Sequence, residues 1–192
     1  MHSIRSLKAL RARLSARGAL LCRFARAREA ATAVEFALVA TPFFALIFAI
    51  LQTAIIFFAG QTLETAAANA SRLILTGQAQ TGGWDAAQFK QQVCAQIYAI
   101  FDCTNSVYVD VESYTSFAAV NLNPPVSNGN FDGSQLGFNP GGPGAIVLVR
   151  LYYQFPVYVS LLNLNGGLSN LNGGYNLLAA TVVFKNEPYS SS

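Results

Sequence analysis

The chain has 192 residues, of which 53% are hydrophobic and 11% are charged. An average soluble domain carries roughly 25% charged residues, so this composition excludes an intrinsically disordered chain and argues against a fully soluble globular protein. The net charge of +3 is divided unevenly, because residues 1–29 carry a net +7 and residues 30–192 a net −4. A division of this kind indicates orientation across a membrane rather than a charged ligand.

The longest apolar segment runs from Phe36 to Gly60 and contains no charged residue. Its polar side chains are Thr41, Gln52 and Thr53. As a helix, this segment is about 37 Å long, which exceeds the ~30 Å hydrocarbon core of a bilayer and predicts a slightly tilted transmembrane helix. Because the basic residues precede the segment and no similar cluster follows it, we expect a single-pass protein with a cytoplasmic N-terminus and an exported C-terminal part.

Three other interpretations of this region remain open. The first is a secretory signal peptide cleaved in the alanine-rich stretch 66–70, although the basic arm is too long and the apolar run is about twice an ordinary signal-peptide core. The second is a mitochondrial transit peptide, suggested by the Arg- and Ala-rich, acid-poor arm. The third is a buried helix of a soluble protein, which is disfavoured because no other segment is apolar enough to surround it.

A lone carboxylate, Glu35, lies at the edge of the apolar segment. An acid in a membrane segment is costly and is by default a functional hypothesis. The alternative is that Glu35 lies among lipid headgroups beside Arg28. The residues by themselves favour neither interpretation.

The string AATAVEFALV at residues 30–39, followed by Pro42, resembles the TadE-like family of pseudopilins. These proteins belong to the tight-adherence (Tad/Flp) pilus system of bacteria, which is related to type IV pili. In that family a basic leader is followed by a small residue, usually Gly, then four residues, a Glu and an aromatic residue. This chain has Ala30 in place of the Gly. The resemblance is strongest over residues 24–75, and residues 183–189 are weakly similar to the closing pattern of the family.

The resemblance implies cleavage by a prepilin peptidase between Ala30 and Ala31, on the cytoplasmic side. Glu35 and Phe36 would then be the fifth and sixth residues of the mature chain. In a helix, the new α-amino group at Ala31 would lie one turn from the Glu35 carboxylate. The implied function is a non-catalytic minor pseudopilin-like component of Tad/Flp pilus assembly in the bacterial inner membrane. The implied partners are the prepilin peptidase, other Tad pilins and pseudopilins, inner-membrane assembly proteins and the lipid bilayer.

The helix is predicted to continue beyond the membrane to Thr76, where Thr76-Gly77 gives a stop signal. Apolar residues recur there at helical spacing, namely Leu63, Ala66, Ala67, Ala70, Leu73 and Ile74. A second helix is predicted from Asp85 to Phe101. Its apolar face contains Ala86, Phe89, Val93, Ile97 and Ile100.

Strands are predicted after the second helix. Residues 107–112 alternate between valines and polar or aromatic residues, which is typical of a half-buried strand. Further strands are predicted at 117–122, 145–153 and 177–185. The expected fold class is α+β and pilin-like, with a small periplasmic domain in which helices cover one face of an antiparallel sheet. The expected domains are a basic cytoplasmic arm (1–30), the transmembrane and extended helix (31–76) and the periplasmic domain (77–192).

Two stretches are predicted to be loops. Residues 123–144 contain six Gly and four Pro, which predicts no regular element. Part of this stretch, residues 128–133, resembles the start of a calcium loop but has Asn at the first ligand position and at the position of the bidentate Glu. Residues 163–176 hold a tandem seven-residue repeat and are interpreted as a surface loop, because two copies are too few for a solenoid.

Two cysteines, Cys94 and Cys103, lie on the side predicted to be exported. In an oxidising periplasm we expect them to form a disulfide, with two free thiols as the alternative. Cys22 lies in the cytoplasmic arm and is expected to stay reduced.

Catalysis is not expected. The one histidine, His2, lies in the arm, and the exported part contains few, scattered acids. The pair Asp110 and Glu112 is assigned to the solvent face of its strand rather than to an acid/base pair. No cofactor, metal or nucleic acid is expected. The alternative function is an unprocessed, single-pass, membrane-anchored envelope binding or adhesin-like module, and an anchored periplasmic hydrolase is the weakest candidate.

Overall fold

The structure, a computed structural model, describes residues 28–97, 102–158 and 167–189, and gives side-chain surroundings from residue 31 onward. The chain forms two compact units, residues 1–48 and 49–192. The division falls within helix α2 (Arg28–Leu75). Each unit is described here by itself.

Helix α2 confirms the long helix predicted over residues 31–76. It has 48 residues and includes Pro42. It ends where the sequence predicts, because Gly77 adopts a left-handed φ of 79° and its amide bonds the carbonyl of Ile74 at 3.0 Å. Glycine adopts this conformation without a steric penalty and commonly terminates helices. The last carbonyl of the helix, that of Leu75, accepts a bond from the Glu187 amide at 3.0 Å, so the C-terminal segment closes this end of α2.

Replacing Gly77 by Ala is expected to lower the free energy of unfolding by about 1–3 kcal/mol, because a side chain there meets an unfavourable positive φ. An added Cβ would also contact the ring of Tyr189. Removing that ring with Tyr189→Ala should therefore reduce the cost of Gly77→Ala while leaving the φ penalty. A chemical-denaturation double-mutant cycle measures this difference, and equal costs in both backgrounds would contradict the ring contact.

Two short helices follow α2: α3 (Gln78–Thr81) and α4 (Ala86–Cys94). A capping box starts α4, in which the Gln88 amide donates to Asp85 Oδ1 at 2.7 Å and the Asp85 amide donates to Gln88 Oε1 at 3.0 Å. This reciprocal pairing satisfies two amides that the first turn leaves free.

The predicted extent of the second helix, to Phe101, is wrong, because α4 ends at Cys94. The chain then turns with the tighter bonds Gln96 N to Val93 O and Ile97 N to Cys94 O. The reason is the disulfide to Cys103, which holds the two Cα atoms 5.5 Å apart. Nine residues of continuous helix would separate them by about 13 Å. Residues 98–101 lie outside the described part of the chain.

The sheet has three antiparallel strands in the order β1-β4-β5. Helix α5 (Cys103–Ser106) leads into β1 (Val107–Tyr114), and β4 (Ile146–Pro156) pairs with both β1 and β5 (Tyr175–Lys185). The strands predicted at 107–112, 145–153 and 177–185 are therefore confirmed. As the central strand, β4 is buried along most of its length, which explains its nearly continuous apolar sequence.

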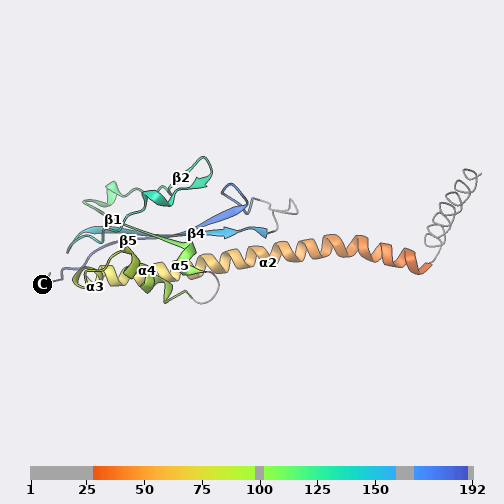
Figure 1. Cartoon of the computed structure of the whole chain (residues 1–192), viewed down its shortest axis with the longest axis horizontal. Helices are drawn as coiled ribbons and strands as arrows, with labels where there is room; N and C mark the ends of the chain where they lie inside the picture. Colours follow the sequence, from red (N-terminus) through yellow and green to blue (C-terminus); the bar gives the residue numbers. More distant parts are fainter. Residues whose placement is uncertain (1–27, 98–101, 159–166, 190–192) are drawn as a thin grey trace, which may run out of the picture. The chain divides into compact units, whose positions relative to one another are not determined.

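One face of the sheet packs against the helices (Figure 1). Helix α2 contributes a stripe of buried residues at helical spacing, in which small alanines allow close approach of the sheet: Ile56, Ala59, Leu63, Ala66, Ala67, Ala70 and Ile74. Helix α4 adds Phe89 and Val93, and β4 contributes alternate residues to the same core: Val147, Val149, Leu151, Tyr153 and Phe155.

Loops cover part of the opposite face of the sheet (Figure 1). The Phe131 ring lies 4.9 Å from that of Tyr108 and 5.3 Å from that of Tyr152, centroid to centroid. The stretch 123–144 does contain regular structure, contrary to prediction. Strands β2 (Val126–Ser127) and β3 (Asn130–Phe131) form a minimal hairpin. Its turn is Asn128-Gly129, with φ values of 51° and 75°, and Asn-Gly is a strong signal for such a turn.

The strand predicted at 117–122 is wrong. Residues Phe117–Ala119 form a single 3₁₀ turn, and Phe117 and Leu122 are exposed. The guanidinium of Arg150 donates to the carbonyl of Asn121 in this segment and to that of Asn123 just after it.

Candidate functional site

The residues expected at the processing site lie in the first turns of α2. Ala30 and Ala31 are consecutive helical residues, and the side chains of Ala31, Glu35 and Phe36 are exposed. Ala31 and Glu35 are separated by four residues and so lie one turn apart on the helix surface. Within the first unit, the structure thus presents these residues on an accessible helix.

The described residues include one helix that is long and apolar enough to span a bilayer, within Ala31–Leu75. Large apolar side chains are exposed on it from residue 34 to residue 58: Val34, Phe36, Leu38, Val39, Phe43, Phe44, Leu46, Phe48, Ile50, Leu51, Ile55, Phe57 and Phe58. Such an unbroken exposed apolar surface is unusual on a soluble protein and marks a membrane or protein contact.

The polar side chains in the apolar run all have partners within the protein. Thr41 Oγ1 donates to the Ala37 carbonyl and Thr53 Oγ1 to the Ala49 carbonyl, each at 2.8 Å. Gln52 is buried, and its Oε1 accepts a bond from the Tyr158 amide at 3.2 Å. For both threonines and for Gln52 Oε1, the hydrogen bonding is met without water, as a lipid environment requires.

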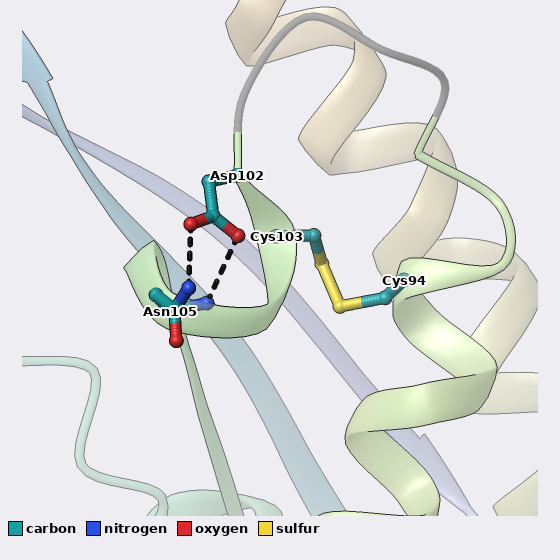
Figure 2. The surroundings of a disulfide bond; sticks show 4 residues. All are labelled: Cys94, Asp102, Cys103 and Asn105. Atoms are coloured by element: carbon teal, nitrogen blue, oxygen red, sulfur yellow. Dashed lines mark hydrogen bonds between the residues drawn. A yellow bond between two sulfur atoms is a disulfide. The ribbon is translucent and has the colours of Figure 1, made fainter.

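The expected disulfide between Cys94 and Cys103 is present and joins the end of α4 to the start of α5 (Figure 2). Beside it, Asp102 caps α5 by accepting from the Asn105 amide at 3.2 Å and from its side-chain Nδ2 at 2.6 Å. These bonds from Asn105 stabilise the carboxylate and lower the pKa of Asp102. The bridge and cap fix the connection between the helical layer and β1.

Replacing both cysteines by serine is expected to lower the free energy of unfolding by about 2.6 kcal/mol, the loop-closure entropy of so short a ring. Chemical denaturation compares the free energy of unfolding of three forms: the oxidised wild-type protein, the reduced wild-type protein and the double serine variant. Reduction should reproduce most of the effect of the double substitution, and equal stability of all three forms would contradict it.

The prediction that Asp110 and Glu112 lie at the solvent face of their strand is wrong for Asp110, which is buried, while Glu112 is partly exposed. Asp110 is 1% exposed, and both carboxylates bind the guanidinium of Arg150 on β4. Arg150 Nε donates to Asp110 Oδ2 at 2.8 Å, and Arg150 Nη2 donates to Glu112 Oε1 at 2.7 Å. Arg150 Nη1 donates to the carbonyls of Asn121 and Asn123 at 3.2 and 3.0 Å. Burial is the largest single effect and lowers the pKa of Arg150, but the charge and hydrogen bond of Asp110, together with the smaller effects of Tyr152 and Glu112, outweigh it and raise the pKa.

The second oxygen of Asp110 accepts from the Gly137 amide at 2.9 Å. The acids and Arg150 therefore hold two loop segments against the sheet. The single guanidinium pairs with both carboxylates, of which Asp110 is buried and Glu112 is partly exposed. The sequence feature that indicates the burial of Asp110 is Arg150, because an arginine inside a strand that is apolar on both faces requires a buried acidic partner.

The comparisons with known proteins agree with the amino-terminal geometry. The family model described as TadE-like protein matches residues 30–72, which begin at the expected processing site and end within α2. Neither the curated proteins nor the solved structures compared with the chain give a match. The resemblance read from residues 30–39 is thus confirmed, and the similarity to the TadE-like family extends over residues 30–72.

Proposed function

We propose that the protein is a minor pseudopilin-like, non-catalytic component of the Tad/Flp pilus assembly machinery. The observation that carries the proposal is the coincidence of the TadE-like match at residues 30–72 with a helix whose exposed residues are all apolar from residue 42 to residue 58. The TadE-like segment relates the chain to the Tad pilus machinery. The helix supplies the means of residence in a membrane and of packing against other helices.

In this proposal α2 spans the bacterial inner membrane, with the basic arm in the cytoplasm and the sheet-containing part in the periplasm. The net +7 of residues 1–29 against −4 for the remainder supports this orientation. The disulfide supports an oxidising compartment for residues 94–103. The partners are a prepilin peptidase, other Tad pilins and pseudopilins, and inner-membrane assembly proteins.

Processing between Ala30 and Ala31 tests the proposal. The full-length protein is expressed with an active or an inactivated prepilin peptidase, extracted from membranes and sequenced from its N-terminus. The expected product begins at Ala31 with the active enzyme and retains the arm with the inactive one. Retention of the arm in both cases would favour an unprocessed anchored binding module, and a product beginning near Asn69 would favour ordinary secretion.

Replacing Glu35 by Ala is expected to impair processing or pilus incorporation while membrane insertion stays intact. The physical reason is that the new Ala31 amine, or the amine of a neighbouring subunit, would lose its pairing with the Glu35 carboxylate in a low dielectric. Immunoblots of membrane and sheared pilus fractions measure both steps.

Glu64 provides the matched control for this substitution. It is the next acid along α2 and is also exposed, with a bond from Gln61 Nε2 at 3.1 Å. Glu64→Ala should leave processing and incorporation unchanged. Normal assembly of the Glu35 variant, or equal defects in both variants, would exclude a specific role for Glu35.

A further inference from the structure

The sheet-containing part of the protein begins to cover α2 while the exposed surface of that helix is still apolar. With the buried Gln52 included, the stripe of α2 starts one turn before Ile56, and the Gln52 side chain is joined to the Tyr158 amide. On the uncovered side of the same two turns lie Leu51, Ile55 and Phe58. For about 12 Å of helix, one side therefore packs on the sheet while another presents large apolar side chains.

The exposed side changes character at Gly60. From residue 42 to residue 58, the exposed residues are apolar; after Gly60, they include polar and charged residues at successive turns: Gln61, Glu64, Thr65, Asn69 and Arg72. A sharp change from apolar to polar side chains along one exposed helix surface is the pattern expected where a membrane ends. That change falls two turns after the start of the buried stripe.

Four exposed side chains make up what we call the rim: Leu51, Ile55 and Phe58 of α2, and Tyr158 at the end of β4. Each is between 47% and 66% exposed. Tyr158 lies at the level of Gln52 because its amide bonds that side chain. Aromatic residues with a polar tip, such as tyrosine, are enriched at membrane–water interfaces.

Helix length agrees with an interfacial position for the rim. From Phe36, where the apolar segment begins, to Ile56 the helix rises about 30 Å, which matches the ~30 Å hydrocarbon core. A headgroup layer of about 5–7 Å on the far side then reaches to about Gly60. The rim residues of α2 therefore lie at the outer end of the hydrocarbon core and the start of the headgroup layer.

We propose that the rim is a lipid-contact surface that lies at the boundary between the hydrocarbon core and the headgroup layer of the outer leaflet. The end of β4 then enters the bilayer interface instead of standing clear of it on a polar stalk. The occupant is lipid, because the rim continues the exposed apolar surface of the spanning segment without a polar break and ends at the polar residues after Gly60. This inference rests on the proposed membrane anchoring of α2.

The test places one tryptophan at a time in full-length protein reconstituted into phosphatidylethanolamine–phosphatidylglycerol vesicles, with bromine on the upper acyl carbons of the lipids. The native Trp84 is first replaced by Phe. Tyr158→Trp probes the rim, and Phe117→Trp is the matched control, since Phe117 is also exposed but lies in the loops on the other face of the sheet. Phe44→Trp probes the spanning segment. If Trp84→Phe prevents folding, the same variants are read as difference spectra with Trp84 retained.

The expected result is strong loss of emission and a blue shift for Tyr158→Trp and little loss for Phe117→Trp. Equal, weak quenching of these two variants with strong quenching of Phe44→Trp would overturn the inference and leave the anchoring intact. Protection of Tyr158→Trp from aqueous iodide without quenching by bromolipid would show a protein contact, such as a second copy, and would also overturn it. Absence of quenching for Phe44→Trp would remove the anchoring itself.

Discussion

Replacing Arg150 by Met is expected to lower the free energy of unfolding by about 3–5 kcal/mol, because it leaves a buried charge without a partner. Asp110 is 1% exposed and receives both a hydrogen bond and an ion pair from Arg150. The substitution also removes the donor to the carbonyls of Asn121 and Asn123. Guanidinium denaturation of the full-length protein in detergent, followed by near-ultraviolet circular dichroism, measures the loss.

Two further variants separate the charge from the packing. Asp110→Asn combined with Arg150→Met removes both buried charges while Asn can still accept from the Gly137 amide, so it should recover a large part of the stability. Glu112→Gln should cost about 1 kcal/mol or less, because the Glu112 side chain is 37% exposed and its pairing is solvated. If the double variant is no more stable than Arg150→Met, the unpaired charge is not the source of the loss.

The sequence predicts the regular elements whose periodicity is set by burial. The apolar stripe of α2 recurs because one side of a continuous helix meets the sheet, and Gly77 stops it because a left-handed residue is needed there. Strands β1 and β4 are recognisable because each buries apolar residues, and β5 because alternate residues, Leu178, Ala180, Val182 and Phe184, pack at least partly against the core. These features depend on neighbouring residues in the chain, which a sequence pattern records directly.

The errors arise where partners distant in sequence decide the local structure. The segment 117–122 has strand-like composition, but the carbonyl of Asn121 accepts a bond from Arg150 of β4, about thirty residues away in sequence. Asp110 fits the polar half of an alternating strand until the covering loop on that face is known. Likewise α4 stops at Cys94 because the disulfide turns the chain back.

In the candidate site, too, features that depend on neighbouring residues are predictable from the sequence, and features that depend on distant partners are not. Residues 30–39 are recognisable as a string because their role depends on order along one helix, and the family match covers them. The lipid-facing rim instead joins residues 51–58 to Tyr158, which are a hundred positions apart and are brought together by the bond between Gln52 and Tyr158. No pattern in the apolar run from Phe36 to Gly60 reveals that one side of its last two turns packs on the sheet while the other side is exposed.

Replacing Phe89 by Ala is expected to lower the free energy of unfolding by about 3–5 kcal/mol, the range observed when a buried aromatic side chain leaves a cavity. Phe89 is fully buried on α4, and its ring lies 5.5 Å from that of Phe138, centroid to centroid. Because α4 has nine residues and two buried side chains, it has little other apolar area with which to hold its place. Denaturation of the full-length protein in detergent measures the loss.

Phe117→Ala is the control for this substitution, because it removes the same side chain from a site that is 59% exposed, and it should change stability by no more than about 0.5 kcal/mol. Phe89→Leu should fall between the two, since it retains part of the buried volume. The disulfide at Cys94 tethers the end of α4 independently, so reduction should increase the cost of Phe89→Ala. If reduction leaves that cost unchanged and Phe89→Ala is no worse than Phe117→Ala, then packing of Phe89 does not hold α4 on the sheet.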